Sequence, residues 1–405
     1  MDTGVTAWML TSTAFVLFMT LPGLAMFYSG LVQAKSVLSV VIQCFTISAI
    51  ASLLWFIVGY SLAFGDTVGW FIGMPDKAFF YGIDHGHLRG DMPEIVFVIF
   101  QLTFAIIAPA IIVGAYTERM KFQAILLFSA AWHLLVYAPI CHWVWGDGWL
   151  HQLGIMDFAG GVVLHANVGV AALVAALYVG KRQIFPHELV PAHNPGLAAA
   201  GAGMLWVGWF GFNGGSALAA NGEAGMAIAV THISASAGLL TWTFLDWIKF
   251  RRPTLIGAII GAIAGLAAVT PASGYIGPVG GMILGITAST VCFFAVGIVK
   301  WKLLIDDSLD VFAVHGLGGI LGTLLIPFLA LEIMDGHGYV VEGRPILVQL
   351  GVQVLGVLAS MAWAGIFTFL ILKVLDLVLR KVRVDPMDEI VGLDVAIHGE
   401  RGYDL

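Results

Sequence analysis

Long apolar runs dominate this chain and constrain its fold more than any other feature. Each comes close to the roughly 20 residues that a helix needs to cross a lipid bilayer. Hydrophobic residues make up 60% of the 405 residues and charged residues only 11%, a balance that excludes a soluble domain of this size. The sequence therefore predicts an all-α integral membrane protein with eleven transmembrane helices, at residues 7–30, 38–64, 93–115, 122–145, 158–180, 196–214, 224–248, 254–270, 276–299, 309–333 and 346–380.

The basic residues predict the orientation of these helices, because cytoplasmic loops retain Lys and Arg. With the N-terminus outside, 15 of the 18 basic residues fall on the cytoplasmic side, and only Lys77, Arg89 and Arg344 fall outside. One helix more or fewer would move every later loop to the opposite side of the membrane, and the basic residues would no longer gather on one side. We expect a multi-pass protein of the plasma (inner) membrane with a cytoplasmic C-terminus. No basic segment of the kind found in a cleaved leader precedes the first run, so we expect that run to remain a helix.

Two histidines lie inside predicted membrane helices. His165 occurs in FAGGVVLHANVGVAALVAALYVG and His315 in VFAVHGLGGILGTLLIPFLALEI, and both begin the spacing H-x-x-x-G. A titratable group at that depth costs several kcal/mol unless it faces the protein interior or a pathway, so it marks a functional site by default. A single histidine of this kind, hydrogen-bonded to a carbonyl, could equally well have a purely structural role. Two at matching positions favour a functional pair.

The histidine positions indicate an internal repeat. Helices 1–5 and 6–10 form two halves of opposite orientation, residues 1–180 and 195–333, with the histidines on the fifth and tenth helices. Inverted repeats are typical of transporters, whose site lies near the midplane between the halves. An eleventh helix at 345–380 completes a transmembrane domain of residues 1–380, and residues 381–405 form a cytoplasmic tail.

An aspartate precedes each histidine. Asp157 lies eight residues before His165, and Asp310 lies five residues before His315. Because these spacings differ, the match between the two halves is imperfect. Asp157 directly precedes a helical run, so we expect it to cap that helix and thereby to orient the site.

Aromatic residues and one hydroxyl gather near the predicted outer ends of the third, fourth and sixth helices. Several of them share helix faces through spacings of three or four residues, and the set comprises Phe100, Phe104, Trp145, Trp209, Phe212 and Ser216. Ring faces attract a desolvated cation and a hydroxyl accepts its hydrogen bond, which favours a site for a small cation. Membrane aromatics also serve as interfacial belts or packing, and this alternative stays open. Gln101 and Asn213 either join helices or bind substrate.

Several other functions are disfavoured. The net charge is -7 with acidic residues spread over many loops, and no basic face exists, so we expect no nucleic-acid partner. The histidines lack carboxylate or cysteine companions at ligand spacing, so we expect no metal, no cofactor and no enzyme activity. The cysteines lie in apolar runs without metal-ligand spacing, which predicts buried thiols and no disulfide for Cys44, Cys141 and Cys292.

Eight longer motifs resemble a known family. They are FYSGLVQAKSVLS, GYSLAFGD, FQLTFAIIAPAIIVGAYTER, DFAGGVVLH, WVGWFGFNGGS, GYIGPVGG, DVFAVHGLGG and GLDVAIHGE, and they extend from the first helix to the tail. The chain closely resembles the bacterial ammonium transporter family, the Amt branch of the Amt/Mep/Rh superfamily. This resemblance implies a homotrimer with one pore per subunit. It also implies that the tail, EIVGLDVAIHGERGY, is the region that in many relatives receives a PII-type signalling protein.

The resemblance further implies an outer recruitment site. In the family an aromatic cage and a serine bind ammonium, and the matching residues here are Phe104, Trp145 and Ser216. Phe100 and Trp209 line the same region.

Below this site the family has a gate and a pore. The resemblance assigns the gate to Phe104 and Phe212, the twin histidines of the pore to His165 and His315, and the structural aspartate near the recruitment site to Asp157.

These residues suggest how ammonium is distinguished from potassium. An ammonium ion that loses its water in a narrow apolar pore faces a large Born cost, which it escapes by giving up its proton. Potassium has no proton to give. We expect neutral ammonia to pass the histidines with coupled proton transfer. The alternatives are an electroneutral ammonia channel and an ammonium sensor with little flux; the short tail after the last helix favours transport over sensing.

Overall fold

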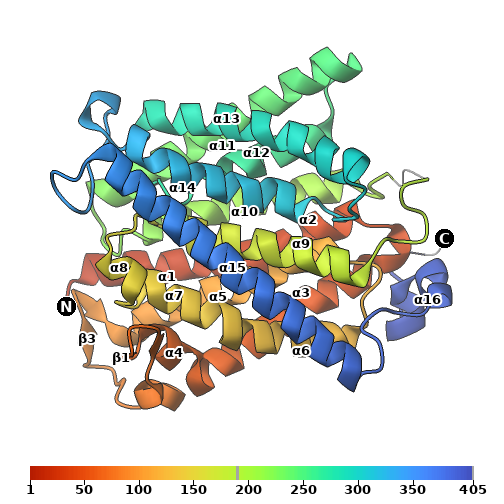
Figure 1. Cartoon of the computed structure of the whole chain (residues 1–405), viewed down its shortest axis with the longest axis horizontal. Coiled ribbons are helices and arrows are strands. Elements are labelled where there is room, and N and C mark those ends of the chain that lie inside the picture. The colour runs from red at the N-terminus through yellow and green to blue at the C-terminus, as the bar shows by residue number, and fades with distance from the viewer. Residues whose placement is uncertain (188–190, 404–405) are drawn as a thin grey trace.

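The protein is a bundle of long helices that run alongside one another, with the two chain termini at opposite ends of the bundle (Figure 1). The computed structural model describes residues 1–187 and 191–403. Its α-helices are α1 (Thr3–Phe18), α2 (Ala25–Leu31), α3 (Val37–Leu54), α4 (Tyr60–Phe64), α5 (Glu94–Tyr116), α6 (Phe122–Trp132), α7 (Ala138–Trp145), α8 (Trp149–Gln152), α9 (Asn167–Val179), α10 (Pro195–Gly215), α11 (Gly222–Phe250), α12 (Leu255–Val269), α13 (Pro278–Gly297), α14 (Leu317–Leu329), α15 (Ile346–Val378) and α16 (Pro386–Val391).

Short turns of other helix types interrupt or join these helices. The π-helical turns are η1 (Met19–Leu24), η3 (Trp55–Gly59), η5 (His133–Tyr137), η6 (Gly161–Ala166), η7 (Ile298–Lys302), η8 (Phe312–Gly316) and η10 (Asp394–His398). The 3-10 turns are η2 (Ala34–Ser36), η4 (Pro75–Phe80) and η9 (Glu332–Met334). Single π-helical turns are rare and occur frequently at functional sites. His165 lies in η6 and His315 in η8.

Nine helical stretches among the described residues are long and apolar enough to cross a membrane. They are Thr3–Leu31, Ala34–Phe64, Glu94–Tyr116, Phe122–Gln152, Gly161–Val179, Gly222–Phe250, Pro278–Lys302, Phe312–Leu329 and Ile346–Val378. Two predicted spans coincide with helices outside this set: α12 has only 15 residues, and α10 is rich in glycine. The predicted all-helical, multi-pass membrane architecture is confirmed. The count of eleven, the inverted repeat and the orientation stay predictions.

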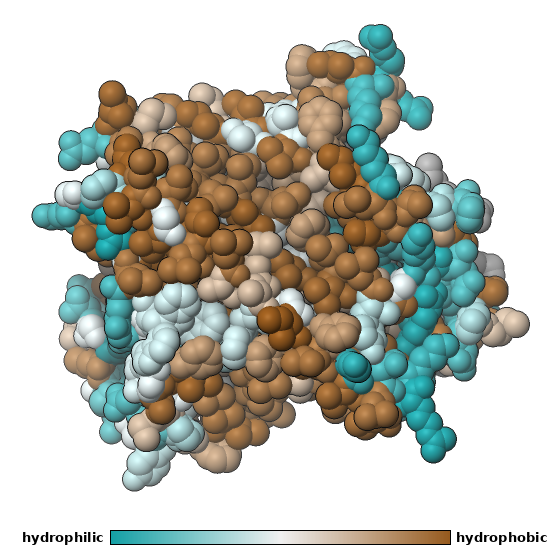
Figure 2. Space-filling model, viewed as in Figure 1, coloured by the Kyte–Doolittle hydropathy of each residue, from teal (hydrophilic) through white to brown (hydrophobic). Residues whose placement is uncertain are grey.

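The outer surface has the polarity expected of a protein surrounded by lipid. On the face shown in Figure 2, hydrophobic residues cover the middle and hydrophilic residues gather toward the two ends. Large apolar side chains are exposed on α11 and α15, among them Leu240, Phe244 and Leu377. In the most apolar 18 residues of each of the nine stretches, the buried share is largest for α5, at 83%, and only 33% for α15, which crosses the front of the bundle in Figure 1. The core therefore surrounds α5.

A structured loop joins α4 to α5. It contains two antiparallel strand pairs, β1 (Thr67–Val68) with β2 (Ile72–Gly73), and β3 (Leu88–Arg89) with β4 (Met92–Pro93). Glu94 follows β4 and begins α5, and its buried carboxylate accepts hydrogen bonds from Tyr60 Oη and Lys77 Nζ, each at 2.5 Å. These bonds tie the start of α5 to α4 and to the loop.

The two histidine-bearing helices match in form and cross closely. Helices α9 and α14, which follow η6 and η8, each contain 13 residues. A side chain on Gly169 would collide with the backbone of Gly316, and one on Gly319 would collide with Cβ of His165. Glycine at these positions lets the two backbones touch. The H-x-x-x-G spacing therefore serves the crossing that brings the histidines together.

Candidate functional site

The two histidines meet inside the bundle. His165 Nδ1 and His315 Nδ1 are 3.3 Å apart, and the ring planes differ by 16°. Both side chains are buried. In neutral imidazoles one Nδ1 must donate and the other accept, so the contact requires opposite tautomers. Trp209 stacks on the other side of His165 at a centroid distance of 5.6 Å, and its Nε1 donates to Thr270 Oγ1 at 2.8 Å.

Asp157 caps the turn that carries His165. Its carboxylate accepts backbone N–H bonds from Gly160, Gly161, Val162 and Val163, at 2.5 to 3.0 Å. The first N–H groups of a helix have no partner within it, so a carboxylate there both satisfies them and complements the helix dipole. The predicted capping contact is therefore present, and it fixes the orientation of η6.

Asp310 does not play the matching part in the other half. Its Oδ2 pairs with Lys300 Nζ at 2.7 Å. Asp307 instead accepts the N–H of Phe312, the first residue of η8, at 2.7 Å. Asp307 also lies eight residues before His315, the spacing that separates Asp157 from His165. The pairing of Asp157 with Asp310 expected from the sequence is thus wrong at the level of contacts, because the cap requires the longer spacing.

The predicted aromatic residues form a column above the histidines. Phe104 and Phe212 lie against each other, with centroids 4.3 Å apart and planes inclined by 39°. Phe104 also meets the edge of Trp145 at 5.6 Å. The Phe212 ring is 6.5 Å from that of His165. Two stacked rings therefore separate the histidines from the space above.

That space is an open vestibule of about 430 Å³. Five residues that the sequence analysis singled out contribute to its lining, Gln101, Phe104, Trp145, Asp157 and Ser216. Trp145 is held in place because its Nε1 donates to the Asp157 carbonyl at 2.8 Å, and Ser216 Oγ donates to the Phe212 carbonyl at 2.8 Å. The serine oxygen keeps lone pairs that can accept a hydrogen bond from a bound cation.

Much narrower spaces lie beside the histidines, separate from the vestibule. One, of about 10 Å³, is lined by His165, Trp209, Phe212 and His315 among others. A second of similar size lies at His315 and is lined also by Tyr28, Leu309 and Val314. Each has room for about one water molecule and is walled mainly by apolar side chains. Only a small molecule without a hydration shell fits such a passage.

The residues that line the vestibule differ in part from those predicted from the sequence. Phe100 is buried against Phe104 and Gly215 and is not among the residues that line the vestibule. The vestibule wall includes residues that sequence reasoning did not single out, namely Phe64, Arg89, Phe97, Phe158, Glu223 and Tyr275. They come from loops and helices far apart in the chain, and nothing in their local spacing indicates the site. Within the described ranges, no cluster of three or more His, Cys, Asp or Glu side chains could hold a metal ion.

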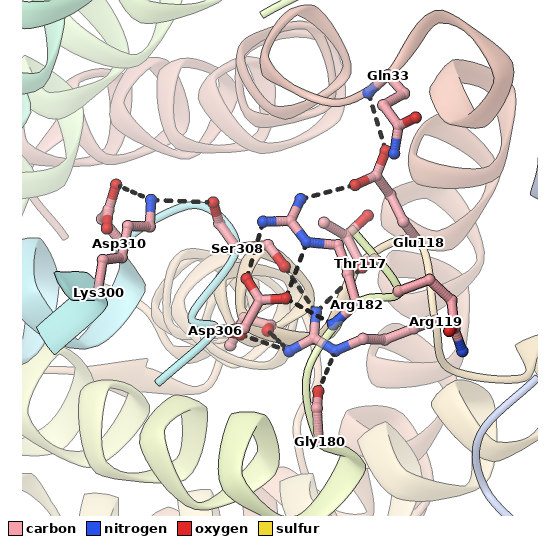
Figure 3. Close-up of polar contacts among 12 residues, drawn as sticks. Gln33, Thr117, Glu118, Arg119, Gly180, Arg182, Lys300, Asp306, Ser308 and Asp310 are labelled. Atoms are coloured by element: carbon pink, nitrogen blue, oxygen red, sulfur yellow. Dashed lines mark hydrogen bonds and ion pairs between the residues drawn. The ribbon is translucent and has the colours of Figure 1, made fainter. Parts of the chain in front are cut away.

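A cluster of charged residues lies near the segment that leads into η8 (Figure 3). Arg182 binds Asp306 Oδ1 and Glu118 Oε2, both at 2.8 Å. Arg119, fully buried, donates to the carbonyls of Ala115 and Asp306. Burial opposes ionisation of Asp306, but Arg182 and Arg119 hold the pKa of this carboxyl below its usual value. The cluster therefore ties the segment before His315 to the ends of α5 and α9.

The C-terminal tail packs against the same end of the bundle. Val384 N donates to the Arg119 carbonyl at 3.0 Å, and Lys121 N donates to the Val382 carbonyl at 2.9 Å. Asp394 accepts the N–H groups of Leu38 and Ser39 at the start of α3, at 3.0 and 2.7 Å. The tail is thus part of the folded structure.

The comparisons with known proteins agree with this geometry. The model of the Ammonium Transporter Family matches residues 7–403. The chain belongs to the ammonium transporter family. An ammonium transporter of Aquifex aeolicus is 44% identical over 407 residues, covering 100% of this chain and 94% of that protein. Ammonium transporter Amt1 of Archaeoglobus fulgidus is 40% identical, with 100% of each chain covered. The resemblance seen in the sequence is therefore confirmed.

Solved structures of the ammonium transporter family share the fold. Mep2 of Saccharomyces cerevisiae has a TM-score of 0.88 at 32% identity, covering 95% of this chain and 88% of that chain. A protein described as a sensor Amt protein has a TM-score of 0.91 at 31% identity, covering 97% of this chain and 98% of that chain.

Proposed function

We propose that the protein transports ammonium across the plasma (inner) membrane into the cytoplasm. It recruits the ion in the vestibule, removes its proton, and conducts ammonia past the histidine pair with coupled proton transfer. The observation that carries this proposal is the position of Phe104 and Phe212, whose rings are 4.3 Å apart between the vestibule and the histidines. A pathway blocked by two aromatic rings and continued by apolar walls suits a small molecule that has shed its charge.

Recruitment rests on Phe104, Trp145 and Ser216. The rings of Phe104 and Trp145 stand at 85° to each other, and both line the vestibule. Ring faces attract cations by about 0.5 to 2 kcal/mol, more as the site loses water. The Ser216 oxygen adds one acceptor. Trp209 supports the layer below rather than the vestibule wall, since it stacks on His165.

Deprotonation supplies the selectivity. Behind Phe104 and Phe212 the lining is mainly apolar, so an intact cation pays the cost of lost hydration there. Ammonium avoids that cost by leaving its proton, and potassium has no such route. His165 and His315 then offer one donor and one acceptor to the passing ammonia molecule. We assign the proton to the histidine pair, which makes uptake electrogenic.

Topology and assembly complete the proposal. Eleven membrane helices in two inverted halves, with the N-terminus outside, accommodate α10 and α12 together with the nine apolar stretches. A homotrimer would cover part of the apolar surface that a single subunit exposes. The docked tail, including α16 and η10, offers a cytoplasmic face to a PII-type signalling protein.

Two alternative functions differ from the proposed one in what crosses the membrane. An electroneutral ammonia channel would return the proton outside. A sensor would bind ammonium with little flux, and one structural neighbour is described as a sensor Amt protein. The two small spaces that His315 lines, separate from the vestibule, favour conduction over binding in the vestibule alone.

Current on a solid-supported membrane tests the proposal. Proteoliposomes receive an ammonium pulse and then a potassium pulse at the same ionic strength, with protein-free liposomes as the control. We expect a transient with ammonium alone. If neither ion gives a transient, internal pH separates the alternatives, because neutral ammonia entry raises the pH inside and a sensor leaves it unchanged. A potassium transient equal to that of ammonium would reject the selectivity argued from the apolar walls.

A further inference from the structure

Asp157 and Asp307 occupy equivalent places before the two histidines. Each lies eight residues before its histidine in the chain, and each carboxylate accepts the N–H of the residue five positions later, Val162 or Phe312. Both therefore cap the π-helical turn that carries a histidine. Asp157 lines the vestibule at one end of the pathway. Asp307 lies at the other end, on the segment held by the charged cluster of Figure 3.

The two carboxylates differ in whether each oxygen has a hydrogen-bond partner. Each oxygen of Asp157 accepts two backbone N–H bonds, four in total. Asp307 is fully buried, and its Oδ1 has no hydrogen-bond partner within the described part of the chain. A buried carboxylate oxygen without a partner is costly, and the cost is relieved when that oxygen takes a proton. Capping alone does not require this free oxygen.

Asp307 and His315 are linked through one π-helical turn. Phe312, whose N–H Asp307 accepts, begins the turn that contains His315, so the capped residue and the histidine are three residues apart, a rise of roughly 5 Å along the backbone. The small cavity beside His315 has room for about one water and is lined also by Tyr28 and Leu309. A side chain on Gly114 would collide with both Val311 and the phenol of Tyr28, so these two residues lie close together there, and Tyr28 Oη donates to the Ile111 carbonyl at 2.9 Å.

Asp307 has several charged groups close to it in the chain and in the fold, one of them partly exposed. Lys300 Nζ binds Asp310 Oδ2 at 2.7 Å, and the Lys300 side chain is 17% exposed. Asp306, Arg182 and Arg119 stand in the adjoining cluster. Burial, followed by the charge of Asp310, raises the pKa of the Asp307 carboxyl to about 7.

We propose that Asp307 accepts the proton that the histidine pair takes from ammonium and releases it into the cytoplasm. The proton leaves a ring nitrogen of the pair, passes through water in the small cavity beside His315, and binds the free Oδ1. The resulting carboxylic acid loses it to cytoplasmic water, which restores both the carboxylate and the neutral imidazoles. The inference rests on the proposed function, because it requires that the proton enter the pore.

The test compares Asp307→Asn with the wild type in proteoliposomes. The amide oxygen can still accept the Phe312 N–H, but the side chain cannot take up a proton at neutral pH. We expect the ammonium-evoked current to fall about 100-fold, in line with the loss of a proton-transfer group. We expect ammonia still to enter, so that internal pH now rises after the pulse. The carboxylate-preserving Asp307→Glu should keep a measurable current.

Asp246→Asn is the matched control. Asp246 is a buried aspartate that accepts a hydrogen bond from Thr254 at 2.5 Å, between α11 and α12, away from the histidines. The ammonium-evoked current of the Asp246→Asn variant should equal that of the wild type. A wild-type current in Asp307→Asn would overturn the inference, and so would equal loss of current and ammonia entry, which indicates that Asp307 only positions His315.

A measurement on the wild type covers the case in which the variant does not fold. The infrared difference spectrum between ammonium and buffer, with aspartate carboxyls labelled by ¹³C, should contain a new protonated-carboxyl band. Absence of that band would overturn the inference even if transport is intact. Failure of the proposed function is distinguishable, because the wild type would then give neither current nor ammonia entry.

Discussion

His165 and His315 face each other through their Nδ1 atoms, 3.3 Å apart, where two helical segments cross with Gly169 against the backbone of Gly316. One ring donates and the other accepts, so the pair can carry a single proton without losing the bond. Two positive rings at this distance would repel. The geometry thus couples the protonation of one histidine to that of the other.

The first prediction concerns selectivity at the histidine pair. Asp at either position, in His165→Asp or His315→Asp, places a carboxylate in the passage that attracts any small cation. We expect ammonium-over-potassium discrimination to fall at least about tenfold, or ~1.4 kcal/mol. Currents from paired ammonium and potassium pulses measure it. Discrimination that stays at the wild-type level in both variants would refute the role of the pair.

The second prediction concerns recruitment. Trp145→Leu removes the indole that borders the vestibule. Loss of one cation–ring contact of ~0.5 to 2 kcal/mol should raise the ammonium concentration for half-maximal current about 2- to 30-fold, with a smaller effect on the maximum. Trp70→Leu is the control, because Trp70 is 63% exposed and does not line the vestibule. A shift of equal size in both variants would argue against a cation site.

The third prediction concerns the helix crossing. Valine at Gly169 would collide with the backbone of Gly316, so Gly169→Val should destabilise the protein by ~1 to 3 kcal/mol and widen the gap between the histidines. Thermal unfolding in detergent and the ammonium current check both effects. Gly203→Ala, where nothing lies within 4 Å of the new methyl, should unfold at or above the wild-type temperature. Wild-type stability in Gly169→Val would show that the backbones need not touch.

The fourth prediction concerns the charged cluster. Arg182→Met leaves Asp306 and Glu118, with side chains 0% and 2% exposed, without their guanidinium partner. Removing one partner of a buried pair destabilises by ~3 to 5 kcal/mol. Lys181→Met, at an exposed neighbouring residue, should change stability by less than ~0.5 kcal/mol. Equal unfolding temperatures for the two variants would contradict the ion-pair geometry.

The fifth prediction concerns pH. Because the pKa of Asp306 is lower in the folded protein than in the unfolded chain, its ion pair with Arg182 contributes stability above the unfolded value of about 4. This contribution is lost as the pH falls through the lower folded pKa. Unfolding temperatures of the wild type and Asp306→Asn, compared between pH 7 and pH 3, should therefore converge in acid. A constant difference would mean that ionisation of Asp306 is not what stabilises the fold.

The sequence was sufficient for the features that depend on composition and spacing. Runs of about 20 apolar residues predict membrane helices because lipid leaves the backbone no other way to satisfy its hydrogen bonds. His165 and His315 were identifiable because a titratable group in such a run is costly. The capping contact of Asp157 followed from its place before a helix.

Tertiary structure alone decided which of these residues meet. The 3.3 Å contact of the histidines depends on Gly169 and Gly319 at a crossing of segments 150 residues apart, and no local pattern specifies which glycines touch. Asp307, not Asp310, proved to be the counterpart of Asp157, because a cap is defined by the N–H groups it reaches. Arg89 and Tyr275 reach the vestibule only through packing of distant elements. Local sequence fixes helices and burial, whereas contacts between distant segments arise when the whole core is packed.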